Sequence, residues 1–127
     1  MTSVFAISMG AAIGAIVRWR LGLWLSPGGL IPWGTLAANL IGGYLVGVCL
    51  AVFQSLPALD PMWRLALVTG FLGALTTFSS FSAEVVDMLQ QQRYALALGT
   101  AVVHLFGSLL LTIVGIKSAA IFIAIRA

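Results

Sequence analysis

Four long apolar stretches, separated by short links rich in glycine, proline and glutamine, set the pattern along this chain. They cover about residues 4–25, 33–53, 63–89 and 94–116 or beyond. A helix needs about 20 apolar residues to cross the hydrocarbon core of a bilayer, and each stretch is long enough. The pattern therefore predicts an all-α integral membrane protein, with a single domain of four transmembrane helices over residues 1–127.

The large aromatic residues and the composition agree with a membrane location. Trp24, Trp33, Trp63 and Tyr94 stand at the ends of the apolar stretches, and such aromatics are enriched where a span meets the headgroups. Hydrophobic residues make up 61% of the chain and charged residues only 7%, whereas a soluble domain carries about 25% charged residues. So few charges could not cover a surface that faces water.

The same composition argues against several other classes of protein. The formal net charge of +3 is scattered along the chain, whereas a nucleic-acid interface needs a basic patch on one face. The only cysteine, Cys49, lies in an apolar run and is expected to act as a small apolar residue. We find no phosphate-binding glycine loop, metal cluster or nucleophile–histidine–acid set, so the sequence does not predict an enzyme.

Basic residues are divided evenly between the two sides that four spans would define. Arg64, Lys117 and Arg126 belong to the side of the two termini, and Arg18, Arg20 and Arg93 to the opposite side. Because Lys and Arg near the ends of spans set orientation, an even division predicts insertion in both directions. Four short helices are also too small to enclose a pathway alone. We therefore expect an antiparallel, dual-topology homodimer.

Small residues recur four positions apart in three of the stretches. The pairs are Gly10 with Gly14, Gly43 with Gly47, and Gly70 with Ala74. Such spacing lets helix backbones approach closely in lipid, where no hydrophobic force draws helices together. We interpret these pairs as packing contacts.

The third stretch contains a polar segment that contact with lipid does not explain. Five hydroxyl residues and two phenylalanines lie between Thr76 and Ser82, near the expected middle of the membrane. Gly70 and Gly73 precede them and favour a break in the third helix. Broken backbone at membrane depth is tolerated only inside protein or beside a water-filled cavity, and its free carbonyls can hold a cation. We expect a functional site here, with a polar packing seam as the alternative.

Phe78 and Phe81 lie within this segment, three residues apart, and so share one face of a helix. Phenylalanine in such a position is usually a packing residue. The edge of an aromatic ring is positive, however, and can approach an anion without supplying a full charge. Next to so many hydroxyl donors, the two rings favour the lining of a pathway for a small anion.

Polar residues also interrupt the second and fourth stretches. Asn39 has two amide hydrogens that could serve either an anion or an interhelical hydrogen bond. In the fourth stretch, Thr100, His104, Ser108 and Thr112 recur every four residues and draw a polar stripe along one helix face. Neutral donors in a row suit an ion path, although a lone histidine in a span is more often a satisfied interior group.

The ionisable residues near the ends of the spans have a simpler interpretation. Glu84 and Asp87 lie toward the end of the third stretch, and Arg18 toward the end of the first. Pairing with a neighbour, or reaching out to the interface, accounts for side chains at such positions.

Taken together, these residues resemble the Fluc (CrcB) family of microbial fluoride channels, over nearly the whole chain. The resemblance is carried by the stretch from Gly70 to Glu84, and it is supported by residues 34–43, by Gly14 with Arg18, and by Gly107 and Ser108 with Thr112. It implies an antiparallel homodimer in a bacterial inner membrane, with two passive pores selective for fluoride over chloride.

The resemblance also implies roles for individual residues. Those matching the fluoride pathway are Asn39, Phe78, Phe81, Ser80, Ser108 and Thr112, with His104 at a position where members differ. Ser80 stands where many relatives have threonine, which keeps the hydroxyl. A structural sodium ion at the dimer axis would be held by the backbone carbonyls of Gly73 and Thr76.

Two other functions are alternatives to a channel. A small dual-topology exporter of drugs or other organic cations needs an acid in its first span to exchange protons for substrate, and residues 4–25 contain none. A purely structural membrane subunit would not need the polar stripe or the hydroxyl-rich segment, because both cost stability in lipid.

Overall fold

The computed structural model describes residues 2–127, and these residues form helices joined by short links, with no strand among them. The helices are α1 (Thr2–Leu25), α2 (Trp33–Ser55), α3 (Pro61–Arg64), η1 (Leu65–Leu72), α4 (Gly73–Leu75), α5 (Phe78–Gln90) and α6 (Tyr94–Arg126). Four stretches, the third running from Pro61 to Gln90, are long and apolar enough to cross a membrane. The all-helical, four-span prediction is confirmed at this level.

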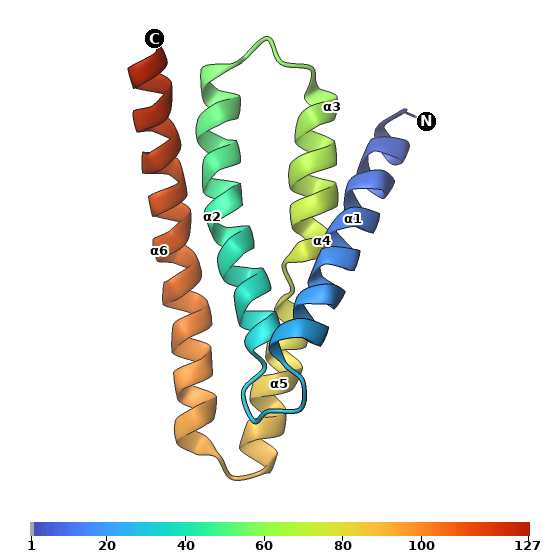
Figure 1. Cartoon of the computed structure of the whole chain (residues 1–127), viewed down its shortest axis with the longest axis vertical. Helices are drawn as coiled ribbons and strands as arrows, with labels where there is room; N and C mark the ends of the chain where they lie inside the picture. The colour runs from blue at the N-terminus through green and yellow to red at the C-terminus, as the bar shows by residue number, and fades with distance from the viewer. Residues whose placement is uncertain (1) are drawn as a thin grey trace.

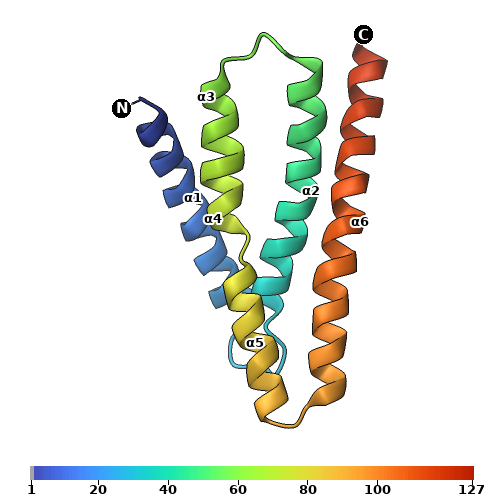
Figure 2. The same cartoon turned by 180° about the vertical axis from the view of Figure 1, so that it is seen from behind.

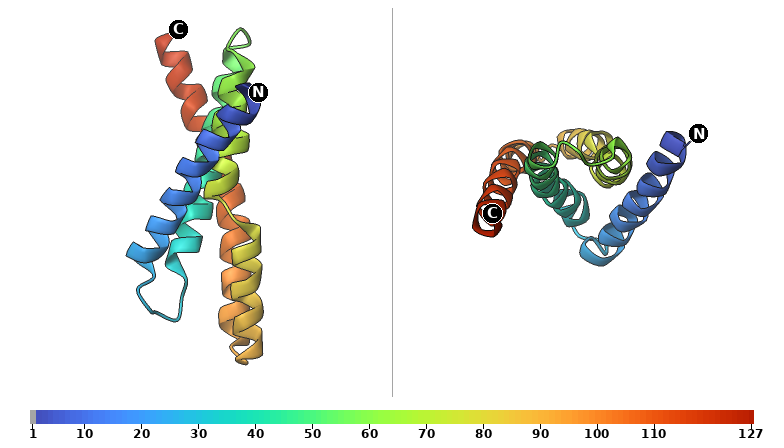
Figure 3. Two further views of the ribbon diagram at one scale, coloured as in Figure 1. Left: turned by 90° about the vertical axis from the view of Figure 1, so that its right-hand side faces the viewer. Right: turned by 90° about the horizontal axis from the view of Figure 1, so that it is seen from above.

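The chain runs up and down, so that the N-terminus, the α2–α3 link and the C-terminus lie at one end (Figures 1 and 2). The other two links lie at the opposite end. Helix α2 packs along α6, and α1 packs against η1 and α4. Seen from above, α1 leans away from the other helices, so the spans form an open row rather than a closed bundle (Figure 3).

Close backbone contact holds the neighbouring spans together. A methyl group added at Gly14 of α1 would overlap the carbonyl oxygen of Phe71, and one at Gly47 of α2 would overlap that of Thr112. Gly115 of α6 meets the backbone of Tyr44 in the same way. The packing role predicted for the small residues is confirmed at Gly14 and Gly47, since neither site has room for a larger residue.

The buried core is small and sits where α2 crosses the third span. Ala38, Leu72 and Leu75 form it, with partly buried apolar side chains around them. Most large apolar side chains point outward instead, including the interfacial aromatics Trp24 and Tyr94. This distribution suits a protein whose outer surface faces hydrocarbon rather than water.

The third span changes backbone conformation near its centre. Residues Leu65–Leu72 form a wide π-helical segment, a form that is rare and often marks a functional site. Gly70 and Gly73 remain helical, and the two residues with extended backbone are Thr76 (φ −81°, ψ 152°) and Thr77 (φ −150°, ψ 115°). The interruption of the helix therefore falls on these two threonines, just after the glycines that favoured a break in the sequence.

Candidate ion pathway

An open cavity of about 620 Å³ lies between α2, the third span and α6. Its lining includes eight of the nine residues predicted to serve the site: Asn39, Gly73, Thr76, Phe78, Phe81, His104, Ser108 and Thr112. The rest of the lining is glycine, threonine and apolar side chains, with no Asp, Glu, Lys or Arg. The cavity therefore offers neutral polar groups against apolar walls.

Asn39 of α2 binds the backbone where the third span becomes extended. Its Oδ1 accepts a hydrogen bond from the Thr77 N–H (2.7 Å), and its Nδ2 donates to the Thr77 carbonyl (3.0 Å). These are two backbone groups that a continuous helix would have paired internally. Asn39 thus makes the interhelical hydrogen bonds that were one of its two predicted roles, while it also lines the cavity.

His104 of α6 is the most enclosed polar side chain of the site, with only 5% of its surface exposed. Its Nδ1 lies 3.1 Å from Asn39 Nδ2. Its ring is tilted by 31° over the Phe81 ring, with centroids 4.5 Å apart. Its Nε2 is buried without a hydrogen-bond partner among the described residues.

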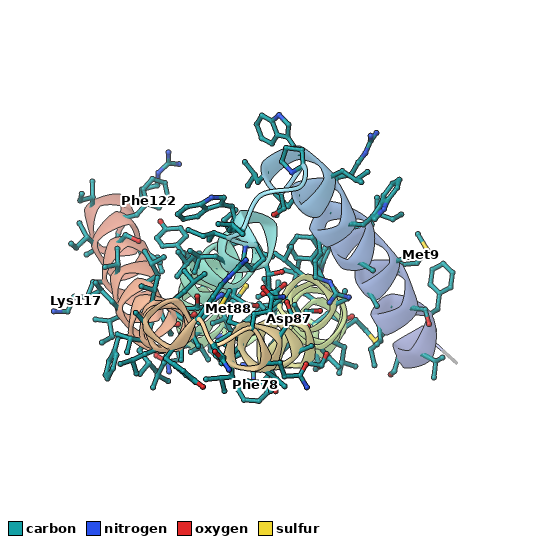
Figure 4. All side chains as sticks on the ribbon, turned by 90° about the horizontal axis from the view of Figure 1, so that it is seen from below. Met9, Phe78, Asp87, Met88, Lys117 and Phe122 are labelled. Atoms are coloured by element: carbon teal, nitrogen blue, oxygen red, sulfur yellow. The ribbon has the colours of Figure 1, made fainter. Side chains whose placement is uncertain are left out.

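The two phenylalanines of α5 meet edge to face, with ring centroids 5.5 Å apart and planes at 67°. They differ sharply in exposure, because Phe81 packs on His104 whereas Phe78 is 79% exposed. Figure 4 shows Phe78 at the outer surface of α5. Of the two rings, Phe81 therefore lies against the buried histidine and Phe78 at the outer edge of the site.

Three of the four residues in the polar stripe of α6 line the cavity, and the fourth does not. His104, Ser108 and Thr112 line the cavity, whereas the Thr100 hydroxyl contacts the sulfur of Met88 at 3.5 Å. The Thr112 hydroxyl donates to the carbonyls of Gly43 and Ser108, both at 2.9 Å. Thr112 consequently also ties α6 to α2 where the glycine contact brings them together.

The hydroxyl-rich segment caps α5 as well as bordering the cavity. The Thr77 side chain accepts a hydrogen bond from the Ser80 N–H at 3.1 Å, which is the geometry of a helix N-cap. Ser80 is half-buried and is the one predicted site residue outside the cavity lining.

One polar contact near the site was not expected from the sequence. Thr35 of α2 donates a hydrogen bond to Oε1 of Glu84, and the other carboxylate oxygen is buried without a partner in residues 2–127. Glu84 is paired, as predicted, but with a hydroxyl. The sequence held a signal only for Glu84, because a threonine 49 positions away gives no sign of being its neighbour.

Comparison with known proteins places the chain in a family. Residues 5–116 match the sequence model of a family described as CrcB-like protein, Camphor Resistance (CrcB). The chain belongs to the CrcB family. Its curated relatives there include one from Albidiferax ferrireducens, 73% identical over 98% of this chain and 95% of the relative. A relative from Variovorax paradoxus is 67% identical over 91% of this chain and 92% of the relative. One from Paracidovorax citrulli is 61% identical over 94% of each chain.

All three of these relatives are named fluoride-specific ion channel FluC. With four apolar spans and bacterial CrcB relatives at this identity, the chain is a multi-pass protein of a bacterial cell membrane. The roles of single residues toward an ion stay predictions.

Proposed function

We propose that the chain is a passive, fluoride-selective channel that lets fluoride leave the cytoplasm, rather than an enzyme or an exporter of organic cations. Membership of the CrcB family and the printed names of its relatives support this function. The observation that carries it in this molecule is the cavity, which gathers hydroxyl, amide, imidazole and aromatic groups without a fixed charge.

Neutral groups suit fluoride for a physical reason. The ion is small and strongly hydrated, so a pathway must replace its water with donors, yet must release the ion at the far side. A lysine or arginine would hold the anion too strongly. The hydroxyl groups of Ser80 and Ser108, the His104 ring and the positive edges of Phe78 and Phe81 would share the task. Asn39 and Thr112, whose hydrogens are engaged within the protein, would hold the walls of the pathway in place.

The extended backbone of the third span is proposed to lie at membrane depth and to hold a sodium ion. In a helix, the carbonyls of Gly73 and Thr76 would accept from the N–H groups of Thr77 and Ser80. Here the Thr77 N–H donates to Asn39 and the Ser80 N–H to the Thr77 side chain. Among residues 2–127 neither carbonyl then accepts a hydrogen bond, and carbonyl oxygen is a ligand that a hard cation prefers.

Two carbonyls are too few for a cation, and this supports an antiparallel homodimer. A second copy related by a two-fold axis would supply the same pair again, as an isologous interface does. The cavity is open rather than enclosed, and the exposed Phe78 would insert into the partner. Replacing sodium with a large organic cation during purification should then weaken the dimer, as measured by its mass in detergent.

The test of the channel is ion efflux from liposomes that contain the purified protein, with a potassium ionophore to carry the compensating charge. Fluoride and chloride electrodes would follow parallel samples. Fast fluoride release without chloride release is expected. A folded protein that releases no fluoride, or releases chloride equally fast, would overturn the proposed function.

A further inference from the structure

The orientation of the Asn39 amide is fixed by the backbone that it meets. Oxygen and nitrogen of an amide are easily exchanged, and only their partners tell them apart. Thr77 offers a donor, its N–H, to one end of the amide and an acceptor, its carbonyl, to the other. Only one orientation satisfies both, with Oδ1 toward the N–H and Nδ2 toward the carbonyl.

This orientation decides which nitrogen of His104 carries the proton. The second hydrogen of Asn39 Nδ2 points at His104 Nδ1, 3.1 Å away, so Nδ1 must accept. In the neutral ring the proton is then on Nε2. A ring protonated on both nitrogens would point Nδ1–H at the Asn39 amino group, which the contact does not allow.

The Nε2–H that results is a donor for which residues 2–127 supply no acceptor. It is buried and unpaired among the described residues, on a side chain that lines the cavity and is 95% enclosed. Phe81 stacks on the ring and limits its rotation. Leaving a buried donor unsatisfied is unfavourable, so its presence on a side chain that lines the cavity points to a ligand.

We propose that Asn39 is a positioning residue that holds His104 as its Nε2–H tautomer, and that this N–H donates a hydrogen bond to the anion in the cavity. The inference rests on the proposed function for the identity of the anion. Asn39 itself has no hydrogen left to offer, since Thr77 and His104 take both. Asn39 thus affects the ion only indirectly, through the imidazole of His104.

The ring can be observed directly, because the chain contains a single histidine. Nitrogen-15 NMR of the histidine-labelled protein in liposomes should show a neutral ring protonated on Nε2. Fluoride should shift the Nε2 resonance and chloride should not. In Asn39→Asp the carboxylate can only accept, so the proton is expected to move to Nδ1. A wild-type ring protonated on Nδ1, or one indifferent to fluoride in a conducting protein, would overturn the inference.

Flux through two amide replacements separates donation from structure. His104→Gln can place an amide N–H near the Nε2 position, whereas His104→Asn keeps only the end that faces Asn39. Fluoride flux in His104→Gln should exceed that in His104→Asn by about tenfold, the effect of one hydrogen bond of ordinary strength. A purely structural histidine would give the opposite order, because His104→Asn preserves the contact with Asn39.

Gly99→Ala, on an open face of α6, serves as the control and should match wild type. The NMR result does not depend on flux. Wild type that shows the Nε2–H form but passes no fluoride would overturn the proposed function, and with it donation to fluoride. Asn39 would still be supported as the residue that orients the ring.

Discussion

Single side chains around the cavity divide into those whose hydrogen-bonding groups are engaged and those that remain free for a ligand. Asn39 uses its oxygen and both amide hydrogens within the protein, and Thr112 directs its hydroxyl hydrogen to backbone carbonyls. His104 keeps one buried nitrogen unpaired. The polar residues therefore form two groups, those that hold the backbone and His104, which keeps a group free for a ligand.

The phenylalanine rings should be needed for conduction. Phe78→Ile and Phe81→Ile remove a positive ring edge while keeping apolar bulk, so fluoride flux is expected to fall at least about tenfold in each. Phe78 is largely exposed, so its replacement should leave the thermal unfolding midpoint of one protomer unchanged. Wild-type flux in both variants, measured in liposomes at equal protein content, would exclude the rings from the pathway.

For single residues, the sequence predicted most of the cavity lining but few of the hydrogen bonds between the lining residues. Spacing alone put His104, Ser108 and Thr112 on one face, because a helix repeats nearly every four residues. The sequence left open whether the Asn39 amide serves an anion or an interhelical hydrogen bond. The answer depends on where the backbone of the third span becomes extended. Ser80 lies outside the lining, and its backbone N–H takes part in the cap of α5.

Between elements, stability depends on close backbone contact and on the capping of α5. The extended residues Thr76 and Thr77 interrupt the hydrogen bonds of the third span, and Asn39 and the Thr77 side chain replace them. The sequence suggested a break but attached it to Gly70 and Gly73. Gly70 is instead required for contact with α1, where an added methyl would meet the Ile7 carbonyl oxygen at 2.6 Å.

The contact between α2 and α6 should not tolerate one added methyl group. Gly47→Ala would force the helices apart at the Thr112 carbonyl, and overpacking of this kind costs about 1–3 kcal/mol. Gly99→Ala adds the same methyl in open space and should be neutral or slightly stabilising, because alanine favours a helix. Thermal unfolding in detergent compares the two. An equal midpoint for both variants would mean that α2 and α6 are not held by this contact.

Thr77 should be needed for the start of α5. Thr77→Val keeps the shape but removes the oxygen that accepts from Ser80 N–H, at a cost of about 1 kcal/mol. Thr77→Ser keeps the cap and is the matched control. Hydrogen exchange of the Ser80 and Phe81 amides would report the loss, with faster exchange expected only in the valine variant. Unchanged protection in that variant would show that the cap is dispensable.

For the whole molecule, the open row of spans and the even division of basic residues between the two sides both favour assembly with a second, oppositely oriented chain. One chain leaves its cavity open and its Phe78 exposed, which is what the proposed antiparallel dimer would cover. The lengths of the apolar stretches predicted the number of spans, because a helix needs about 20 apolar residues to cross a bilayer. The lean of α1 away from the other helices (Figure 3) could not be foreseen, since it depends on which small residues meet.

Dual topology can be tested with a chain whose only native cysteine, Cys49, is replaced by alanine. A new cysteine at Ala58, an exposed position in the α2–α3 link, then marks one side. A membrane-impermeant maleimide added to intact spheroplasts should label about half of the chains, since neither side holds more basic residues. Labelling of nearly all or nearly none of them would contradict dual topology.

Charge should then control both orientation and activity. Gln54→Lys with Ser55→Lys raises the basic residues on the side of the termini from three to five, and Gln90→Lys with Gln91→Lys does the same for the other side. Each double variant alone should insert mostly one way, with its richer side in the cytoplasm, and should lose fluoride efflux from cells. Because an antiparallel pair needs one chain of each orientation, expressing both variants together should restore efflux. Full efflux from either variant alone, with its single orientation verified by labelling, would mean that the working assembly is not antiparallel.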